Sequence, residues 1–284
     1  MRPTVRPPAV AGLFYEGEPG ALRREVVGFL ASAPAPRLPA SRWRGLLMPH
    51  AGYEYSGPIA GAGAGAVEWP DAAVLLGPNH TGLGDAVAVS GASAWRTPLG
   101  DVPVSSELVD LLLSEVPEAT VDERAHAREH SIEVELPFLQ VLRPGIEVAC
   151  VCLGERNLEL CRSVGRGLAA AVERYEASGR RVALVVSSDM NHYLPRPENR
   201  RKDLRAIDAL LAGDPAELFD RVLLRERISM CGVLPATALL EALRALGGAR
   251  PRLLSHGDSG DASGDTDRVV GYASVLWTEP TEEQ

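Results

Sequence analysis

The sequence is poor in lysine, in cysteine and in long apolar runs, and each shortage excludes a class of protein. Lys202 is the only lysine among 284 residues, so there is no P-loop, which needs a lysine after its second glycine. No run of eighteen apolar residues is present, so we expect no membrane-spanning helix. Four cysteines are too few for a disulfide framework in a chain of this length, which indicates a reducing, cytoplasmic location.

The chain also lacks an excess of positive charge. Its formal net charge is -9 at pH 7, from 38 Asp and Glu against 29 Lys and Arg. Phosphate backbones and anionic lipid surfaces repel such a protein, so we expect neither a nucleic-acid nor a membrane partner. A content of 45% hydrophobic and 24% charged residues is typical of a globular domain that can bury a sizeable core.

Short apolar segments that favour strands alternate along the chain with longer segments of helical periodicity. The pattern predicts strands at 45–48, 73–76, 86–90, 146–153, 182–187, 252–255 and 269–276. It predicts helices at 20–30, 57–67, 105–115, 132–142, 158–177, 199–211, 215–225 and 235–246. Pro137 should kink or delay the helix at 132–142.

The apolar strands are continuous Val and Leu runs, which is typical of strands buried on both faces of a sheet. We therefore expect an α/β fold with a largely parallel or mixed sheet flanked by helices. No linker or repeat divides the chain, so residues 1–284 should form a single domain, with 278–284 as a flexible tail.

Three histidines and an aspartate follow the predicted strands. His50 comes after the first strand, His80 after the second, and Asp189 and His192 after the strand at 182–187. Ligands of open α/β sheets bind outside the carboxyl ends of the strands, so these side chains could meet at one edge. Two histidines with an anionic ligand form the facial arrangement of non-haem iron sites, and these ligand types also suit zinc and manganese. The simpler interpretation, that each histidine only caps a strand, is weakened by their grouping.

Two further segments carry candidate ligands. Cys231 precedes the helix at 235–246, and a thiol near a helix N-terminus is often a thiolate, although a buried core cysteine is an equal alternative. HAREHSIE at 126–133 contains H-x-x-E-H, a pattern in which two histidines bind zinc. The segment lacks an apolar face, so we interpret His126 as part of a solvated loop, while His130 could reach the site. Zinc-dependent hydrolysis through His126 and His130 is a weaker alternative.

Several motifs occur in an order that matches a known family. They are GLFYEGEP, MPHAGYEYSG, LLGPNH, EHSIEVELPFL, VVSSDMNHY, the MCG of Cys231 and SGDTDRVVGYAS. With these motifs the chain resembles the Memo family over nearly its whole length. Bacterial members of that family are called AmmeMemoRadiSam system protein B because they are encoded near a radical-SAM protein.

The resemblance implies a fold similar to that of class III extradiol ring-cleaving dioxygenases, which bind ferrous iron through two histidines and a carboxylate. In Memo proteins a cysteine replaces the carboxylate. The resemblance therefore makes His50, His80 and Cys231 the metal ligands. It places Asp189 and His192 in the same pocket, where we expect His192 to act as general base or acid and Asp189 to orient it. His130 and Glu133 are further candidates for substrate binding.

The metal that the resemblance implies is iron(II), with copper or zinc as alternatives. The corresponding function is redox chemistry on a small molecule or a protein partner, with oxygen as a candidate oxidant. A radical-SAM protein and its neighbour are candidate partners by family resemblance. Val233 and Leu234 stand where animal members have Arg-His, so the substrate cannot be carried over. The alternative is a non-catalytic module that binds a metal or a peptide in a vestigial pocket, because thiolate favours softer metals such as Cu(I) or Zn.

Overall fold

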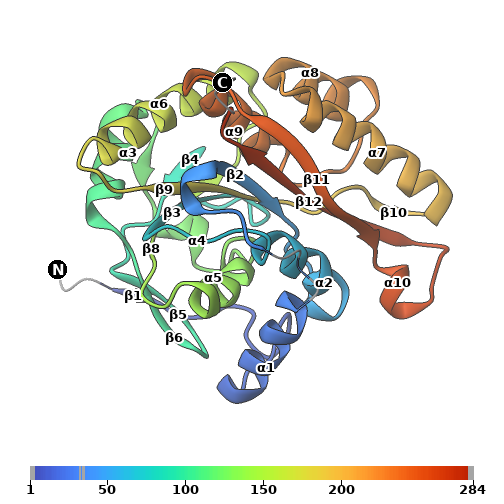
Figure 1. Ribbon diagram of the computed structural model, residues 1–284. Coiled ribbons are helices and arrows are strands. Elements are labelled where there is room, and N and C mark those ends of the chain that lie inside the picture. Colours follow the sequence, from blue (N-terminus) through green and yellow to red (C-terminus); the bar gives the residue numbers. More distant parts are fainter. Residues whose placement is uncertain (1–3, 32, 34–35, 281–284) are drawn as a thin grey trace.

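A twisted mixed sheet forms the centre of the protein in a computed structural model that describes residues 4–31, 33 and 36–280 (Figure 1). In spatial order the strands are β10 (His192–Leu194), β12 (Val269–Thr278), β2 (Trp43–Met48), β9 (Val182–Ser187), β3 (Ala72–Pro78), β8 (Glu147–Leu153), β4 (Val87–Val89) and β7 (Thr120–Val121). Strand β11 (Arg250–Asp258) pairs with β12. The inner strands β2, β9, β3 and β8 are all parallel, whereas β12 and β4 run antiparallel to their inner neighbours.

Helices cover both faces of this sheet (Figure 1). One face carries α1 (Pro19–Leu30), α2 (Tyr53–Ala64) and α5 (Leu136–Leu142). The other carries α3 (Ser106–Glu115), α6 (Leu158–Glu176), α7 (Arg196–Ala212), α8 (Pro215–Phe219) and α9 (Val233–Ala245). None of the helices in the described part of the chain is both long and apolar enough to cross a bilayer.

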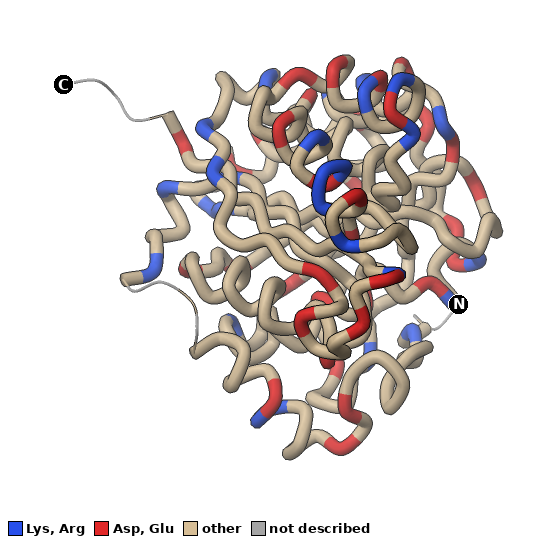
Figure 2. Tube along the Cα trace, turned by 90° about the vertical axis from the view of Figure 1, so that its right-hand side faces the viewer, with Lys and Arg blue, Asp and Glu red and all other residues tan. Residues whose placement is uncertain are grey.

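Two separate cores explain why the central strands are apolar at most positions. In β2, Leu46 and Met48 face the core under α1 and α2, while Leu47 faces the core under α6 and α9. The same alternation divides Leu75 from Leu76 in β3. Few charged residues accordingly lie on the central strands along the trace (Figure 2), and those present are Arg44 of β2 and Glu147 at the start of β8. The predicted α/β domain with helices on both faces is confirmed.

The predicted elements are present, with shifted ends. The helix predicted at 57–67 spans Tyr53–Ala64, and the one predicted at 132–142 opens with a 3₁₀ turn, Glu133–Glu135, so that Pro137 falls in the first turn of α5. The helix predicted at 215–225 divides into α8 and a π-helix, η3 (Asp220–Arg225). The sequence pattern missed the following short elements: β1 (Val5–Arg6), η1 (Ala40–Arg42), β5 (Ala94–Thr97), β6 (Gly100–Pro103), β7, α4 (Glu123–His126), β10 and α10 (Gly260–Ser263).

The prediction places the start of the flexible tail, at residue 278, too early in the chain. Thr278 is the last residue of β12, and the carboxylate of Glu279 pairs with Arg44 and Arg181 at 2.9 and 2.6 Å. Residues 281–284 lie outside the described residues.

Glu133 anchors the N-terminal segment instead of binding substrate, which corrects the prediction from sequence. Its fully buried carboxylate forms an ion pair with Arg6 and accepts hydrogen bonds from the amides of Ala9 and Val10 and from the Tyr15 hydroxyl, at 2.8, 3.0 and 2.7 Å. The Arg6 guanidinium also donates to backbone carbonyls of the 126–129 segment and lies 4.3 Å from the Trp95 ring centroid. Both oxygens of this carboxylate are therefore occupied by groups of the protein and not by a substrate.

Glu133→Gln should destabilise the fold by about 3–5 kcal/mol, because it leaves a buried guanidinium without a counter-charge. Glu107→Gln is the matched control, since Glu107 pairs with Arg180 at the surface and its loss should change the free energy of unfolding little. Urea unfolding of the two variants measures the difference. Equal losses in the free energy of unfolding would show that the buried ion pair stabilises the fold no more than the surface pair does.

Candidate metal centre

Three adjacent strands deliver side chains to one edge of the sheet. His50 lies two residues beyond the end of β2, Asp189 two residues beyond β9 and His80 two residues beyond β3. These strands are neighbours and run parallel, so their carboxyl ends lie side by side. Cys231 reaches the same place from the loop between η3 and α9, next to Gly232, the residue that caps α9.

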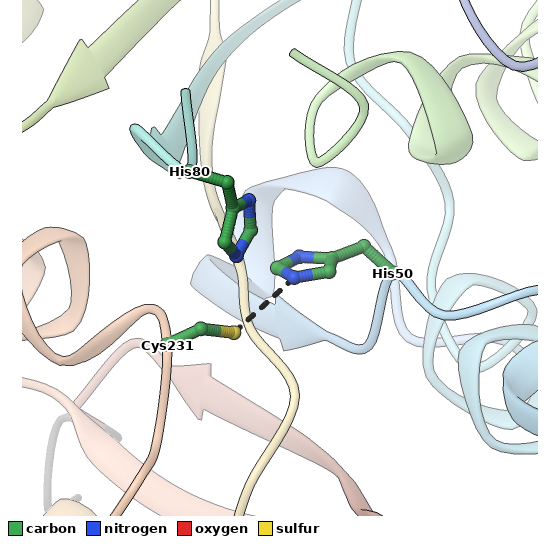
Figure 3. A group of neighbouring side chains, drawn as sticks. All are labelled: His50, His80 and Cys231. Atoms are coloured by element: carbon green, nitrogen blue, oxygen red, sulfur yellow. Dashed lines mark hydrogen bonds between the residues drawn. The ribbon is translucent and has the colours of Figure 1, made fainter. Parts of the chain in front are cut away.

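His50, His80 and Cys231 point toward one another (Figure 3). Each offers one donor atom, and the three donor atoms lie within 4.8 Å of one another. Nε2 of His50 is 3.2 Å from Sγ of Cys231, and the imidazole rings are 5.2 Å apart between centroids at an angle of 83°. Two imidazole nitrogens and a sulfur form a donor set that fits a transition-metal ion such as iron, zinc or copper.

Glu129 fixes the ring of His80. Its buried carboxylate accepts from the His80 amide at 2.6 Å and lies 2.9 Å from His80 Nδ1. It also accepts from the amides of His130 and Ser131, both at 2.9 Å. Burial alone would raise the pKa of Glu129, but the His80 ring and these amides outweigh it and lower the pKa to about 2. An ionised carboxylate at Nδ1 keeps the proton there, which leaves Nε2 of His80 free to bind a cation.

A serine holds the ring of His50 in a comparable way. Ser187 Oγ lies 2.7 Å from His50 Nδ1, and it donates to the Ser131 carbonyl at 2.6 Å or to Glu135 at 2.8 Å. Because the hydroxyl has a single proton, a Ser187 that donates to either partner accepts from Nδ1 of His50. Nε2 of His50, the atom that faces Cys231, is then the unprotonated nitrogen.

Cys231 is held by the loop after β9. The amide of Asp189 donates to its sulfur at 3.1 Å, and the amide of Gly232 donates to Ser188 Oγ at 2.9 Å. Burial and then the nearby Asp189 carboxyl raise the pKa of the thiol, so without a cation it keeps its proton. The thiolate expected from the nearby helix N-terminus is therefore not the resting form. A bound metal ion would displace this proton.

Asp189 and His192 do not form the predicted pair. The Asp189 carboxylate accepts from the His50 amide at 2.9 Å, and burial raises its pKa to about 7. His192 is the first residue of β10, its amide donates to Ser229 Oγ at 2.8 Å, and its buried Nδ1 has no partner among the described residues. Asp189 thus orients the His50 backbone, and no hydrogen bond joins its carboxylate to His192 among the described residues.

His130 belongs to the site and His126 does not. The His130 ring stacks on His80 at 4.7 Å and 19°, and its centroid lies 4.8 Å from that of the Phe14 ring, which is tilted by 58°. His126 is fully buried, with Nε2 3.1 Å from the Ala88 carbonyl and Nδ1 3.5 Å from Cys152 Sγ. The interpretation of His126 as part of a solvated loop was wrong, and so was the zinc pair, because the two histidines point to different parts of the fold. Among the described residues, the groups that could hold a metal ion include His130 but not His126.

Glu129 is the functional residue that the sequence did not reveal. Its only signal was the acidic position of H-x-x-E-H, which was interpreted as part of a zinc motif. In the structure it forms a second group of possible ligands with His80 and His130, within 4.8 Å of one another. Its two oxygens already accept from three amides and an imidazole, so it supports ligands better than it serves as one.

A cavity of about 580 Å³ lies against these side chains. Its lining residues are Phe14, His50, Ala51, Gly52, Tyr55, His80, His130, Asp189, His192, Tyr193, Ser259, Ser263, Asp265, Arg268, Val270 and Tyr272. The predicted site residues His50, His80, Asp189, His192 and His130 are all among them, and Glu133 is not. A volume of this size accommodates a small organic molecule.

The fold and the site together define a class: an α/β protein with a candidate metal site of two histidines and a cysteine at the carboxyl edge of its sheet. The chain matches the Memo-like protein family over residues 6–276, and it belongs to that family. A MEMO1 family protein of Methanopyrus kandleri is 39% identical, with 96% of this chain and 98% of the relative covered. A MEMO1 family protein of Thermotoga neapolitana is also 39% identical over 96% of this chain and 99% of its own.

The fold is shared with a solved structure of low sequence similarity. An uncharacterized protein of Escherichia coli K12 superposes with a TM-score of 0.56 at 17% identity, covering 82% of this chain and 99% of the other. This similarity concerns the architecture alone.

Glu129→Gln should weaken the binding of a divalent metal ion about 10- to 100-fold, because an amide cannot hold the Nδ1 proton of His80 as a carboxylate does. Glu123→Gln is the matched control. Its carboxylate also accepts backbone amides, of Gly91 and Ala92, but contacts no candidate ligand. Titration with Zn²⁺ and a competing chromophoric chelator measures both affinities. If the two variants bind equally tightly, Glu129 does not support the site.

Proposed function

We propose that the protein binds one metal ion through His50, His80 and Cys231 and uses it for redox chemistry on a small molecule. The observation that supports this proposal is the convergence of three donor atoms from three separate segments. Partners on the far side of both rings direct the unprotonated nitrogens toward the ion. Iron(II) is our first choice of metal, with copper or zinc as alternatives, because the donor set suits all three.

Bound iron would supply one-electron chemistry toward oxygen or an oxidisable substrate, and the protein residues would position the reactants. His192 lines the cavity, and its buried Nδ1 has no partner in the described part of the chain. Burial lowers the pKa of His192, so the ring is neutral at pH 7 and can accept a proton from a bound substrate. His130 and Phe14 offer ring faces on which an aromatic substrate could stack.

A second candidate function is a non-catalytic module that binds a metal or a peptide. The cysteine ligand favours it, because a thiolate binds Cu(I) or Zn more readily than a carboxylate does. In either case we propose a cytoplasmic protein, since all four cysteines, Cys150, Cys152, Cys161 and Cys231, are free thiols. A radical-SAM protein encoded nearby is the partner that the family resemblance suggests.

Protein loaded with iron(II) without oxygen should hold one ion per chain, and His50→Ala and Cys231→Ser should each lose most of it. The matched controls are His126→Ala and Cys161→Ser, which remove a buried histidine and a buried cysteine away from the site. Metal analysis after desalting gives the stoichiometry. Unchanged iron in the first pair would refute the ligand assignment.

Iron-loaded protein should consume oxygen when a catechol is added, and His192→Asn should lower kcat roughly 10²- to 10⁴-fold, because asparagine cannot accept the proton. Iron content serves as the control, since His192 is not a proposed ligand and the variant should remain fully loaded. An oxygen electrode records the rate. No turnover with catechols, together with tight peptide binding at the cavity, would favour the non-catalytic module.

A further inference from the structure

A second cavity, of about 590 Å³, lies on the other side of the candidate metal centre. Its lining residues are Pro78, Asn79, His80, Leu153, Gly154, Arg156, His192, Tyr193, Leu223, Ile228, Ser229, Met230, Cys231, Val233 and Leu234. It shares His80, His192 and Tyr193 with the first cavity, but Cys231 lines only the second and His50 only the first. Two cavities therefore adjoin the centre, one lined by His50 and the other by Cys231.

The walls of the two cavities differ in chemistry. The first is lined by Ser259, Ser263, Asp265 and Arg268 in addition to its imidazoles. The second is lined by polar side chains such as Asn79 and Ser229 and by a group of aliphatic side chains, which come from the end of β8, from η3, from the loop before Cys231 and from the start of α9. Aliphatic walls next to a site of chemistry are typical of pockets for apolar small molecules.

One arginine side chain lies beside these aliphatic side chains. Arg156 lines the second cavity, and it is exposed and makes no ion pair or side-chain hydrogen bond among the described residues. No Asp or Glu lines the same cavity in the part of the chain that the structure describes. An anionic group at this position would therefore meet an unneutralised guanidinium, which recognises carboxylates with two parallel hydrogen bonds.

The backbone under the cavity has an unusual conformation. Leu223 is part of the π-helix η3, a form that is rare and often found at functional sites. Arg227 follows with a left-handed φ of 48°, and Lys202 donates to the carbonyls of Glu226 and Arg227 at 3.2 and 3.0 Å. Leu223 of this π-helix lines the cavity, whereas its neighbour Leu224 is 63% exposed and does not line it.

We propose that the second cavity binds a small amphipathic acid, with its apolar body against Leu223, Val233 and Leu234 and its carboxylate on Arg156. The ligand would lie beside the sulfur of Cys231, opposite the polar cavity. This site is independent of the proposed metal chemistry, because neither its aliphatic walls nor Arg156 depends on a bound ion.

Binding of 4-phenylbutyrate to the metal-free protein tests the proposal, with 4-phenylbutyramide as a neutral probe of the same shape. A ligand of this size should bind with a Kd on the order of 1 mM, which calorimetry at high protein concentration can measure. The acid should bind about three- to fivefold more tightly than the amide, and Arg156→Gln should abolish the difference. Higher salt should weaken only the acid.

Two pairs of variants locate the probe. Leu223→Trp should fill the cavity and weaken both probes by about fivefold or more, whereas Leu224→Trp, one residue along and outside the cavity, should not. Arg268→Gln, which removes a cation from the first cavity, should leave binding of the acid unchanged. Three results would each overturn the proposal. The acid could fail to bind at several times the expected Kd, or its affinity could be unchanged by Leu223→Trp. Its affinity could also fall in Arg268→Gln in place of Arg156→Gln. Loss of metal binding in other variants does not bear on this outcome.

Discussion

The candidate centre depends on three parallel strands that end side by side. Met48 of β2 is in register with Ser187 of β9, and β9 is in register with β3 on its other side. Side chains placed two residues beyond each strand end therefore come together, although more than a hundred residues separate Asp189 from His50 and from His80 in sequence. The middle strand contributes Asp189, whose carboxylate holds the amide of His50 and whose own amide holds the sulfur of Cys231. The sheet thus fixes the ligand backbones before any ion binds.

Buried carboxyl groups around this edge have different ionisation states, and each state suits its position. Glu129 is ionised because it faces an imidazole and three amides. Glu135 is fully buried behind Ser187, and burial raises its pKa well above the usual range, so it is a neutral acid. Glu133 pairs with Arg6, which also donates to the carbonyl of Glu129, and so ties the N-terminal segment to the segment that carries Glu129 and His130. The fold and the centre therefore share one polar network, in which the Glu129 carboxylate faces the ring of a proposed ligand, His80.

The sequence predicts the parts of this arrangement that follow from local pattern. Buried parallel strands need apolar residues at every position, so β2, β3 and β9 and their ends could be found from the sequence. The role of Glu129 could not, because Glu129 and Glu133 lie in one irregular segment and point to His80 and to Arg6 only after long-range packing. The same limit applies to His126, which α4 buries against β4, a contact that the charged local sequence gives no sign of. The protonation of Cys231 was missed because its burial comes from loops far away in sequence.

The central claim is that one ion is held between two imidazoles and a cysteine sulfur. X-ray absorption at the iron edge of protein loaded under nitrogen tests it most directly, because it distinguishes sulfur from nitrogen and oxygen ligands. The account predicts one sulfur bound to the metal together with imidazole nitrogens, and the loss of that sulfur in Cys231→Ser. A spectrum of the unsubstituted protein that contains only nitrogen and oxygen ligands would contradict it.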